Sequence, residues 1–156
     1  MTGVQTCALP IFAVKEDGTV LSWGDNRYDQ LGDGIKNDYI PVKVVELSRV
    51  INVDAESDSS FAVIDNGTVW SWGFNENGQL GDGTKNYKNS PAMIDGLTGV
   101  KSIIAGRFHA TVLKHNGTVW AWGSNHCGQL GQLGDGTTYI NKPVQVMCSK
   151  DRKSVV

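Results

Sequence analysis

The chain has 156 residues, of which 40% are hydrophobic and 19% are charged, and its formal net charge at pH 7 is −2. This size suits one domain with a packed core, and the acidic balance argues against the basic face that nucleic-acid binding requires. No apolar run approaches the about 18 residues of a membrane span, and residues 1–14 hold no basic residue of the kind that begins a secretory signal.

Tight hairpin turns are predicted at three places along the chain. At each of them, Asp-Gly or Asn-Gly separates two apolar runs, which favours a type I′ turn with positive φ at both central residues. The turns are expected at Asp17-Gly18, Asn66-Gly67 and Asn116-Gly117. The strands that follow them, taken as the last strand of each unit, are expected near 19–23, 68–72 and 118–122.

Residues 41–73 contain the pattern of one complete unit. Four short apolar runs are separated by polar or turn residues, and no stretch has the apolar period of a helix. The runs cover 42–45, 50–53, 60–64 and 68–72. The next segment, from Gly73 to Pro91, is rich in Gly, Asn and Asp and is predicted to be a turn-filled connection. We therefore expect one four-stranded antiparallel sheet in each unit.

One tryptophan-rich sequence occurs three times. Trp23, Trp72 and Trp122 are 49 and 50 residues apart, and a fixed period of this kind indicates a repeat architecture. The third copy holds three additional residues in a doubled QLG at 129–134. The positions predicted to carry the repeat structurally are Trp23, Gly24, Asn26, Gln30, Leu31, Gly32, Trp70, Trp72, Gly73, Asn75, Gly78, Gln79, Leu80, Gly81, Trp120, Trp122, Gly123, Asn125, Gly128, Gln129, Leu130 and Gly131.

Side-chain alternation gives each sheet two unlike faces. Trp70 and Trp72 lie on one face of their strand, and Val69 and Ser71 lie on the other. We expect the bulky face of one sheet to pack over the small face of its neighbour, where each buried indole removes about 150–250 Å² from water. This packing role is favoured over an aromatic platform for a ligand. Because a closed propeller needs about 4–8 blades, three units predict part of a propeller or a linear β-stack.

The sequences NGTVWSWGFNENGQLGDGT at 66–84 and IIAGRFHATVLKHNGTVWAWG at 103–123 carry a family resemblance. They resemble the regulator of chromosome condensation repeat, including its alpha-tubulin-suppressor-like members, over residues 12–147. The resemblance implies an all-β partial β-propeller, with three four-stranded antiparallel blades of a ring that commonly has seven. Residues 1–11 and 148–156 fit no repeat position and are expected to be non-native segments.

The copies differ at a few positions of the pattern. The second has Glu56 and Ser59 where the third has Gly106 and His109. The first has Asp29 where the other two have glycine. We interpret these differences as drift between blades, and we expect Asp29 to weaken its turn only partly, because Asp tolerates positive φ better than most residues do.

No residue pattern typical of catalysis or of metal binding stands out. The histidines and the cysteine within the repeats lack the spacing of a structural zinc site. The aspartates that recur after each QLG suit turns and lack the pattern of a calcium loop. These residues are His109, His115, His126, Cys127, Asp33, Asp82 and Asp135. We therefore expect no catalytic residue, no metal and no cofactor.

The resemblance implies a non-catalytic scaffold for protein–protein interaction. Family members include exchange factors for a small Ran-like GTPase, so regulation of a small GTPase or of another partner protein is the first hypothesis. Two alternatives stay open. One is an extracellular or surface repeat protein of bacterial type, such as an adhesin or an enzyme inhibitor, and the other is an accessory module of an enzyme. Neither a nucleic acid nor a membrane is an expected partner.

Uncovered sheet faces should make the isolated 156 residues marginally stable or self-associating. The first and third units would each leave one face without a neighbouring sheet, and exposed apolar faces promote association. Size-exclusion chromatography together with binding of the dye ANS tests this expectation. A compact monomer that binds no dye would contradict it.

Overall fold

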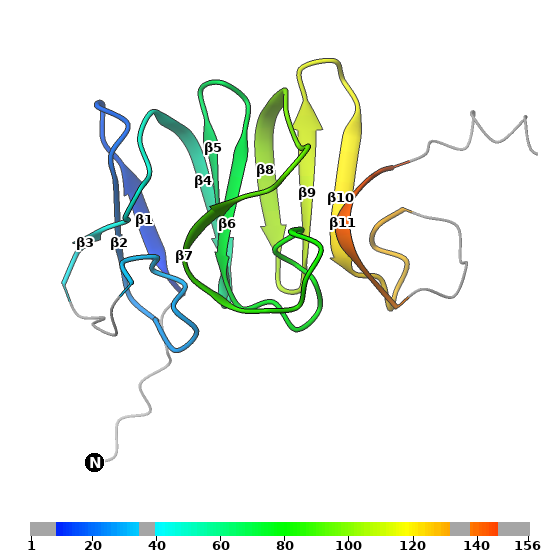
Figure 1. Ribbon diagram of the computed structural model, residues 1–156, viewed down its shortest axis with the longest axis horizontal. Helices are drawn as coiled ribbons and strands as arrows, with labels where there is room; N and C mark the ends of the chain where they lie inside the picture. The colour runs from blue at the N-terminus through cyan, green and yellow to red at the C-terminus, as the bar shows by residue number, and fades with distance from the viewer. Residues whose placement is uncertain (1–8, 35–39, 132–137, 147–156) are drawn as a thin grey trace, which may run out of the picture.

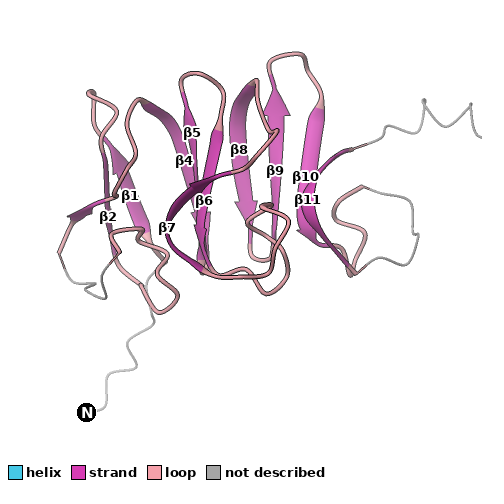
Figure 2. Ribbon diagram, in the orientation of Figure 1, coloured by secondary structure: helices cyan, strands magenta, loops and turns pink. Residues whose placement is uncertain are grey.

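The described part of the chain is built from strands and loops. The computed structural model describes residues 9–34, 40–131 and 138–146, within which there is no helix (Figure 2) and hence none that could cross a membrane. Three antiparallel sheets stand side by side along the molecule (Figure 1). Residues 1–8 and 148–156 of the segments expected to be non-native, and residues 132–134 of the doubled QLG, lie outside the described ranges.

Each sheet is formed by strands that are consecutive in the chain. The first sheet contains β1 (Ile11–Val14), β2 (Val20–Trp23) and β3 (Val42–Lys43). The second contains β4 (Val50–Glu56), β5 (Ser59–Ile64), β6 (Val69–Gly73) and β7 (Lys88–Met93). The third contains β8 (Val100–Gly106), β9 (His109–Lys114), β10 (Val119–Ser124) and β11 (Tyr139–Gln145).

The sequence predicted that the tryptophan strands, at 19–23, 68–72 and 118–122, are the last strands of their sheets. This prediction is wrong. A further strand pairs with each of them, and Ser71 of β6 lies opposite Ala92 of β7. The run at 42–45, expected in the second sheet, begins with β3, which pairs with β2. The long loop after each tryptophan strand returns the chain to the outer edge of the same sheet. Pro91 and Pro143 fit this edge because proline has no N–H to donate to a further strand.

The hairpin turns form at the predicted places but have a different conformation. Only the glycine of each turn has positive φ, for example +79° at Gly67. Gly67 N donates to Ile64 O at 2.8 Å, and Ile64 N donates to Thr68 O at 3.0 Å, which is a three-residue loop with glycine in the left-handed position. The Asn66 Oδ1 atom accepts a hydrogen bond from Thr68 N at 3.0 Å. Asp17 Oδ1 accepts the same bond from Thr19 N at 2.8 Å in the first sheet.

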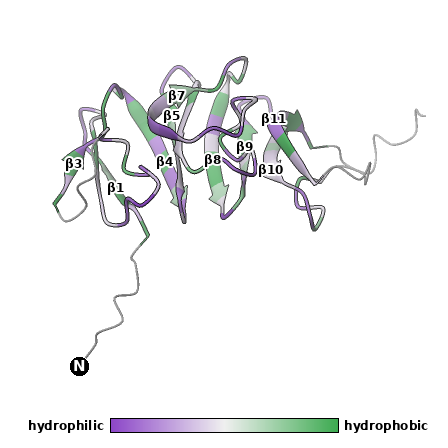
Figure 3. Ribbon diagram, turned by 60° about the horizontal axis from the view of Figure 1, so that its bottom comes forward, coloured by the Kyte–Doolittle hydropathy of each residue, from purple (hydrophilic) through white to green (hydrophobic). Residues whose placement is uncertain are grey.

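The face of the second sheet that carries small side chains, such as Val69, is covered by the next sheet along the chain. Trp122 is 0% exposed and shares one core cluster with Phe61, Val63 and Val69 of the preceding sheet. In the same way, Trp72 shares a core cluster with residues of the first sheet. Hydrophobic and hydrophilic residues alternate along β4 (Figure 3). Each buried indole contributes several kcal/mol, at about 25 cal/mol per Å².

Each buried indole is also hydrogen-bonded to the loop of the preceding sheet. Trp122 Nε1 donates to the Gln79 carbonyl oxygen at 2.7 Å, and Trp72 Nε1 donates to the Gln30 carbonyl oxygen at 2.8 Å. The adjacent Gly81 has φ +73°, and a Cβ atom built there would lie 2.6 Å from Trp122 Nε1. Glycine is therefore required at this junction both for its backbone conformation and for the close approach of the indole.

Replacement of Gly81 by alanine should destabilise the fold more than the same replacement at Gly96. Gly96 has φ +75° with nothing within 4 Å of an added Cβ, so Gly96→Ala should cost only the left-handed conformation, about 1–2 kcal/mol. Gly81→Ala must also displace the Trp122 ring, which should bring its total cost to about 3 kcal/mol or more. Urea unfolding of the two variants measures both losses in the free energy of unfolding. Equal losses would contradict the close contact between Gly81 and the Trp122 ring.

Candidate functional site

The loops that follow β2, β6 and β10 share one internal construction. In the second sheet, Asn75 Oδ1 accepts from Leu80 N at 2.9 Å, and Gln79 Oε1 accepts from Asn77 N at 3.0 Å. Leu80 is 0% exposed and anchors the loop in the core. The matching bonds in the other two loops join Asn26 to Leu31, Gln30 to Tyr28, Asn125 to Leu130 and Gln129 to Cys127.

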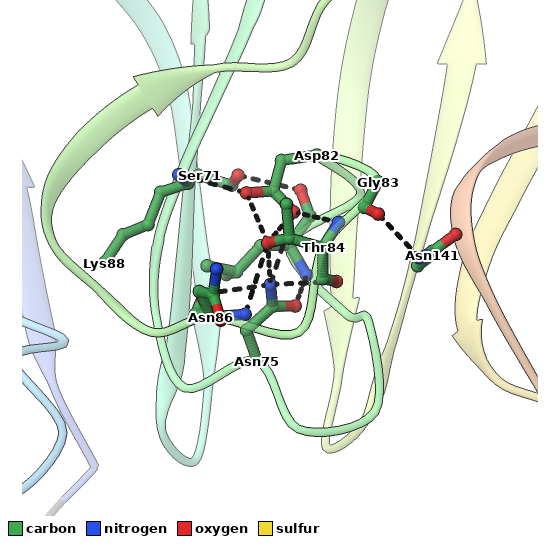
Figure 4. A network of polar contacts seen from close by, with 9 residues as sticks. Ser71, Asn75, Asp82, Gly83, Thr84, Asn86, Lys88 and Asn141 are labelled. Carbon is green, nitrogen blue, oxygen red and sulfur yellow. Dashed lines mark hydrogen bonds and ion pairs between the residues drawn. The ribbon is translucent and has the colours of Figure 1, made fainter.

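A polar network holds the loop after β6 (Figure 4). Asp82 Oδ1 accepts from Thr84 N at 2.9 Å, and Asp82 Oδ2 pairs with Lys88 Nζ at 3.0 Å. Partial burial acts to raise the pKa of Asp82, but the bonds from Thr84 and Lys88 outweigh it and hold the pKa below its usual value. Asn141 of the third sheet donates to the Gly83 carbonyl oxygen at 2.8 Å. The network therefore fixes the loop to its own sheet and to the next one.

The first-sheet loop keeps the same shape without a glycine at one turn. Asp29 has φ +60°, close to the +71° of Gly78 and the +73° of Gly128 at the matching positions. This value agrees with the expectation that Asp tolerates the left-handed conformation at this turn. The recurring asparagine and glutamine side chains of these loops thus hold the loop backbone by hydrogen bonds. Side chains between them that form no such bonds can vary.

One side of the molecule is formed by these loops. We call it the loop surface, and it lies along the lower edge of Figure 1, opposite the Asp-Gly and Asn-Gly hairpins. Because its loops are hydrogen-bonded internally and anchored in the core, it can present variable side chains at fixed positions. Its described residues are 24–34, 57–58, 74–87, 107–108 and 125–131.

Three aromatic side chains cluster on the loop surface. The ring centroids of Tyr28 and Phe74 are 5.0 Å apart, those of Phe74 and Tyr87 are 5.1 Å apart, and those of Tyr28 and Tyr87 are 6.0 Å apart. Tyr28 comes from the loop of the first sheet, whereas Phe74 and Tyr87 come from that of the second. Tyr87 is 46% exposed, and the other two are half-buried. The aromatic cluster therefore bridges two sheets and keeps a face open to solvent.

The Tyr87 hydroxyl is held by an acidic neighbour. It donates to Glu76 Oε1 at 2.8 Å. This hydrogen bond to a carboxylate is the main reason that the pKa of Tyr87 is raised to about 12, and partial desolvation adds to it. The phenol is therefore a hydrogen-bond donor throughout the neutral pH range, and the ring is fixed in place.

A second aromatic site on this side involves the third sheet. The Lys85 ammonium group lies 3.4 Å from the centroid of the Tyr139 ring, in a cation–π contact. Between the second and third sheets there is also a cavity of about 230 Å³, with Leu97 and Trp120 at its apolar side and Asp95 and Lys142 among its charged residues. A cavity of this size accommodates one side chain rather than a cofactor.

The chemistry-bearing residues that we considered from the sequence do not converge. His109 is half-buried in β9, and His115 is exposed in the turn between β9 and β10. His126 and the Cys127 thiol are neighbours in the loop after β10, and both are exposed. Within residues 9–34, 40–131 and 138–146, no three His, Cys, Asp or Glu side chains lie together as metal ligands would. The aromatic cluster was not predicted, because its residues occupy variable positions of the repeat; aromatic residues in otherwise polar loops were the available signal.

Comparison with known families identifies the repeat. The sequence profile of the regulator of chromosome condensation (RCC1) repeat matches residues 17–63, 66–113 and 116–156. A second profile of the same repeat matches residues 100–129. A search of curated proteins gives no match.

Solved structures with RCC1-type propellers have the same fold. Human WBSCR16 has a TM-score of 0.80 and 24% identity, over 91% of this chain and 38% of its own. Prp20p from Saccharomyces cerevisiae, described with its binding properties to Gsp1p and histones, has a TM-score of 0.75 and 18% identity, over 93% and 38%. The structure of Kap60 bound to yeast RCC1 (Prp20) gives 0.60 and 18%, over 90% and 47%. The three sheets are thus blades of a partial β-propeller.

The titration of Tyr87 should depend on Glu76. In the unsubstituted protein, the Tyr87 phenol should titrate near pH 12 rather than 10. Glu76→Gln removes the negative charge that favours the protonated phenol, so the pKa of Tyr87 should fall toward its ordinary value. NMR of the tyrosine ring carbons, assigned with Tyr87→Phe, measures this change. Titration of the unsubstituted Tyr87 near pH 10 would show that the hydrogen bond is absent.

Proposed function

Because the chain belongs to the regulator of chromosome condensation (RCC1) repeat family, we propose that it is a non-catalytic scaffold that binds a partner protein through its loop surface. The observation that carries this proposal is the aromatic cluster of Tyr28, Phe74 and Tyr87, which is partly exposed on loops that are fixed in the core. Tyrosine and phenylalanine are enriched at the centres of protein interfaces because they bury a large area at a low cost in side-chain entropy.

The arrangement of the cluster favours a protein partner over a small molecule. Its three rings pack against one another, and Tyr87 is 46% exposed, so together they present a partly exposed apolar surface. Small-molecule sites are concave and surround most of their ligand, whereas protein partners bind extended surfaces. Gsp1p, histones and Kap60, with which the similar structures are described, are proteins. We therefore propose a small GTPase or another folded protein as the partner class.

Loss of the aromatic cluster should weaken partner binding. We expect the double variant Phe74→Ala, Tyr87→Ala to bind about 30-fold more weakly, because truncation of a central aromatic residue typically costs about 2 kcal/mol or more. Partners are first recovered by affinity capture with the unsubstituted chain. Each recovered protein is then purified and titrated against both forms by calorimetry.

A matched variant separates this effect from a general loss of apolar surface. Ile104 is 67% exposed on β8, outside the loop surface, and Ile104→Ser should leave the affinity unchanged within a factor of about two. Circular dichroism verifies that all forms are folded. The scaffold proposal fails if the double variant binds every recovered partner as tightly as the unsubstituted chain does.

A further inference from the structure

The carboxylates around the aromatic cluster contact only neutral groups. Glu76 accepts from the Tyr87 hydroxyl at 2.8 Å, and Asp58 accepts from Gln30 Nε2 at 3.4 Å. Glu56 and Asp29 lie in the adjoining turn and loop, and none of these four acids is in an ion pair among the described residues. Four negative charges therefore border the cluster without an ion pair of their own, although the charges of Arg27 and Arg107 lie near Asp58.

These acids and the rings belong to one continuous surface. Phe74 N donates to the Asp58 carbonyl oxygen at 2.8 Å, which joins the turn between β4 and β5 to the aromatic cluster. Asp29 directly follows Tyr28, and Glu76 holds the Tyr87 hydroxyl. We call this area, where the loops of the first two sheets meet, the acidic junction: Tyr28, Asp29, Glu56, Asp58, Phe74, Glu76 and Tyr87.

The basic side chains that border the acidic junction are already engaged. Each of them contacts either a carboxylate or an aromatic ring within its own neighbourhood. The pairs are Arg27 with Asp25, Lys88 with Asp82, Lys85 with Tyr139 and Arg107 with Phe108. The two cations that contact rings keep their charge, but the four carboxylates of the acidic junction outnumber them, so the net charge there is negative. Lys142 lines the cavity between the second and third sheets.

Asp58 is a half-buried acid with little hydrogen bonding. Burial raises its pKa, and the charges of Arg27 and Arg107 lie close enough to oppose this effect only in part. Its Oδ1 atom has a single long hydrogen bond, at 3.4 Å, from Gln30. A cation brought to this carboxylate would relieve its desolvation, because an opposite charge favours the ionised form.

We propose that the acidic junction binds a basic, arginine- or lysine-rich segment of the partner protein. This inference rests on the proposed function and specifies the chemistry of its partner. The exposed rings would accept guanidinium or ammonium groups on their faces, and the free carboxylates would form charge-assisted hydrogen bonds with them. Arginine suits this surface better than lysine because its planar group can stack on a ring and bind a carboxylate at the same time.

Labelled peptides test the charge preference directly. The probe is a short fluorescent peptide of alternating arginine and serine, and its counterpart has glutamate in place of arginine. Fluorescence anisotropy against the 156-residue chain at about 0.15 M salt should show binding of the arginine peptide alone, since surface charge attraction persists at this ionic strength over about 8 Å. Binding of the glutamate peptide as tight as that of the arginine peptide overturns the proposal, as does no binding of the arginine peptide.

Matched charge variants then localise the binding. Asp29→Asn with Glu76→Gln removes two charges from the acidic junction, and asparagine still tolerates the positive φ at position 29. Glu16→Gln with Glu46→Gln removes two exposed charges outside the acidic junction. We expect the first pair to weaken arginine-peptide binding about fivefold and the second less than about twofold, because exposed charge pairs contribute modestly and locally. Equal losses would mean that only net charge matters and would overturn the proposal.

The two proposals fail in different ways. If the variant Phe74→Ala, Tyr87→Ala loses a recovered partner while the junction charge pair has no effect on it, the preference for a basic partner is wrong and the scaffold role stands. If the aromatic variant leaves every partner bound, the scaffold role of this surface is wrong, whatever the peptides show.

Discussion

The fold depends on one contact that is repeated between neighbouring sheets. An indole from one sheet lies buried over the sheet before it, and its N–H group donates to a glutamine carbonyl oxygen in the preceding loop, as Trp122 does to Gln79 at 2.7 Å. A buried indole without an acceptor would lose a hydrogen bond in an apolar environment. The loop must therefore place its carbonyl group correctly, and glycine must follow so that the ring can approach. The conformation of the loop and the packing of the buried indole therefore depend on each other.

This dependence explains why the loop surface can be both rigid and variable. The asparagine, glutamine and leucine of each loop are committed to backbone hydrogen bonds and to the core, as Asn75 and Leu80 are in the second sheet. Between them, Glu76 is exposed and Asn77 is half-buried, and neither side chain forms these bonds to the loop backbone. Tyr28 stands at a position that is Asn77 in the second loop and Cys127 in the third. A repeat protein of this kind can therefore alter its surface chemistry from blade to blade without altering its shape.

The sequence was sufficient to predict the repeated sheets and the alternation of side chains along their strands. The spacing of Trp72 and Trp122 and the two faces of their strands were sufficient to predict stacked sheets and buried indoles. The strand at Val42–Lys43 was assigned to the wrong sheet, because strand pairing depends on where a long loop returns; Pro91, as an edge residue, was the available clue. The aromatic cluster could not be predicted, since Tyr28 and Tyr87 are far apart in the chain and meet only where two sheets join.

The hairpin turns on the opposite side have a consequence for the chemical ageing of the molecule. Asparagine followed by glycine is the dipeptide most prone to deamidation, and the turns at Asn66 and Asn116 have this sequence. The first sheet already has a carboxylate at the same place, where Asp17 accepts from Thr19 N at 2.8 Å just as Asn66 accepts from Thr68 N at 3.0 Å. A side chain converted to an ordinary aspartate would keep this bond, so that product gains negative charge on that side without losing the turn.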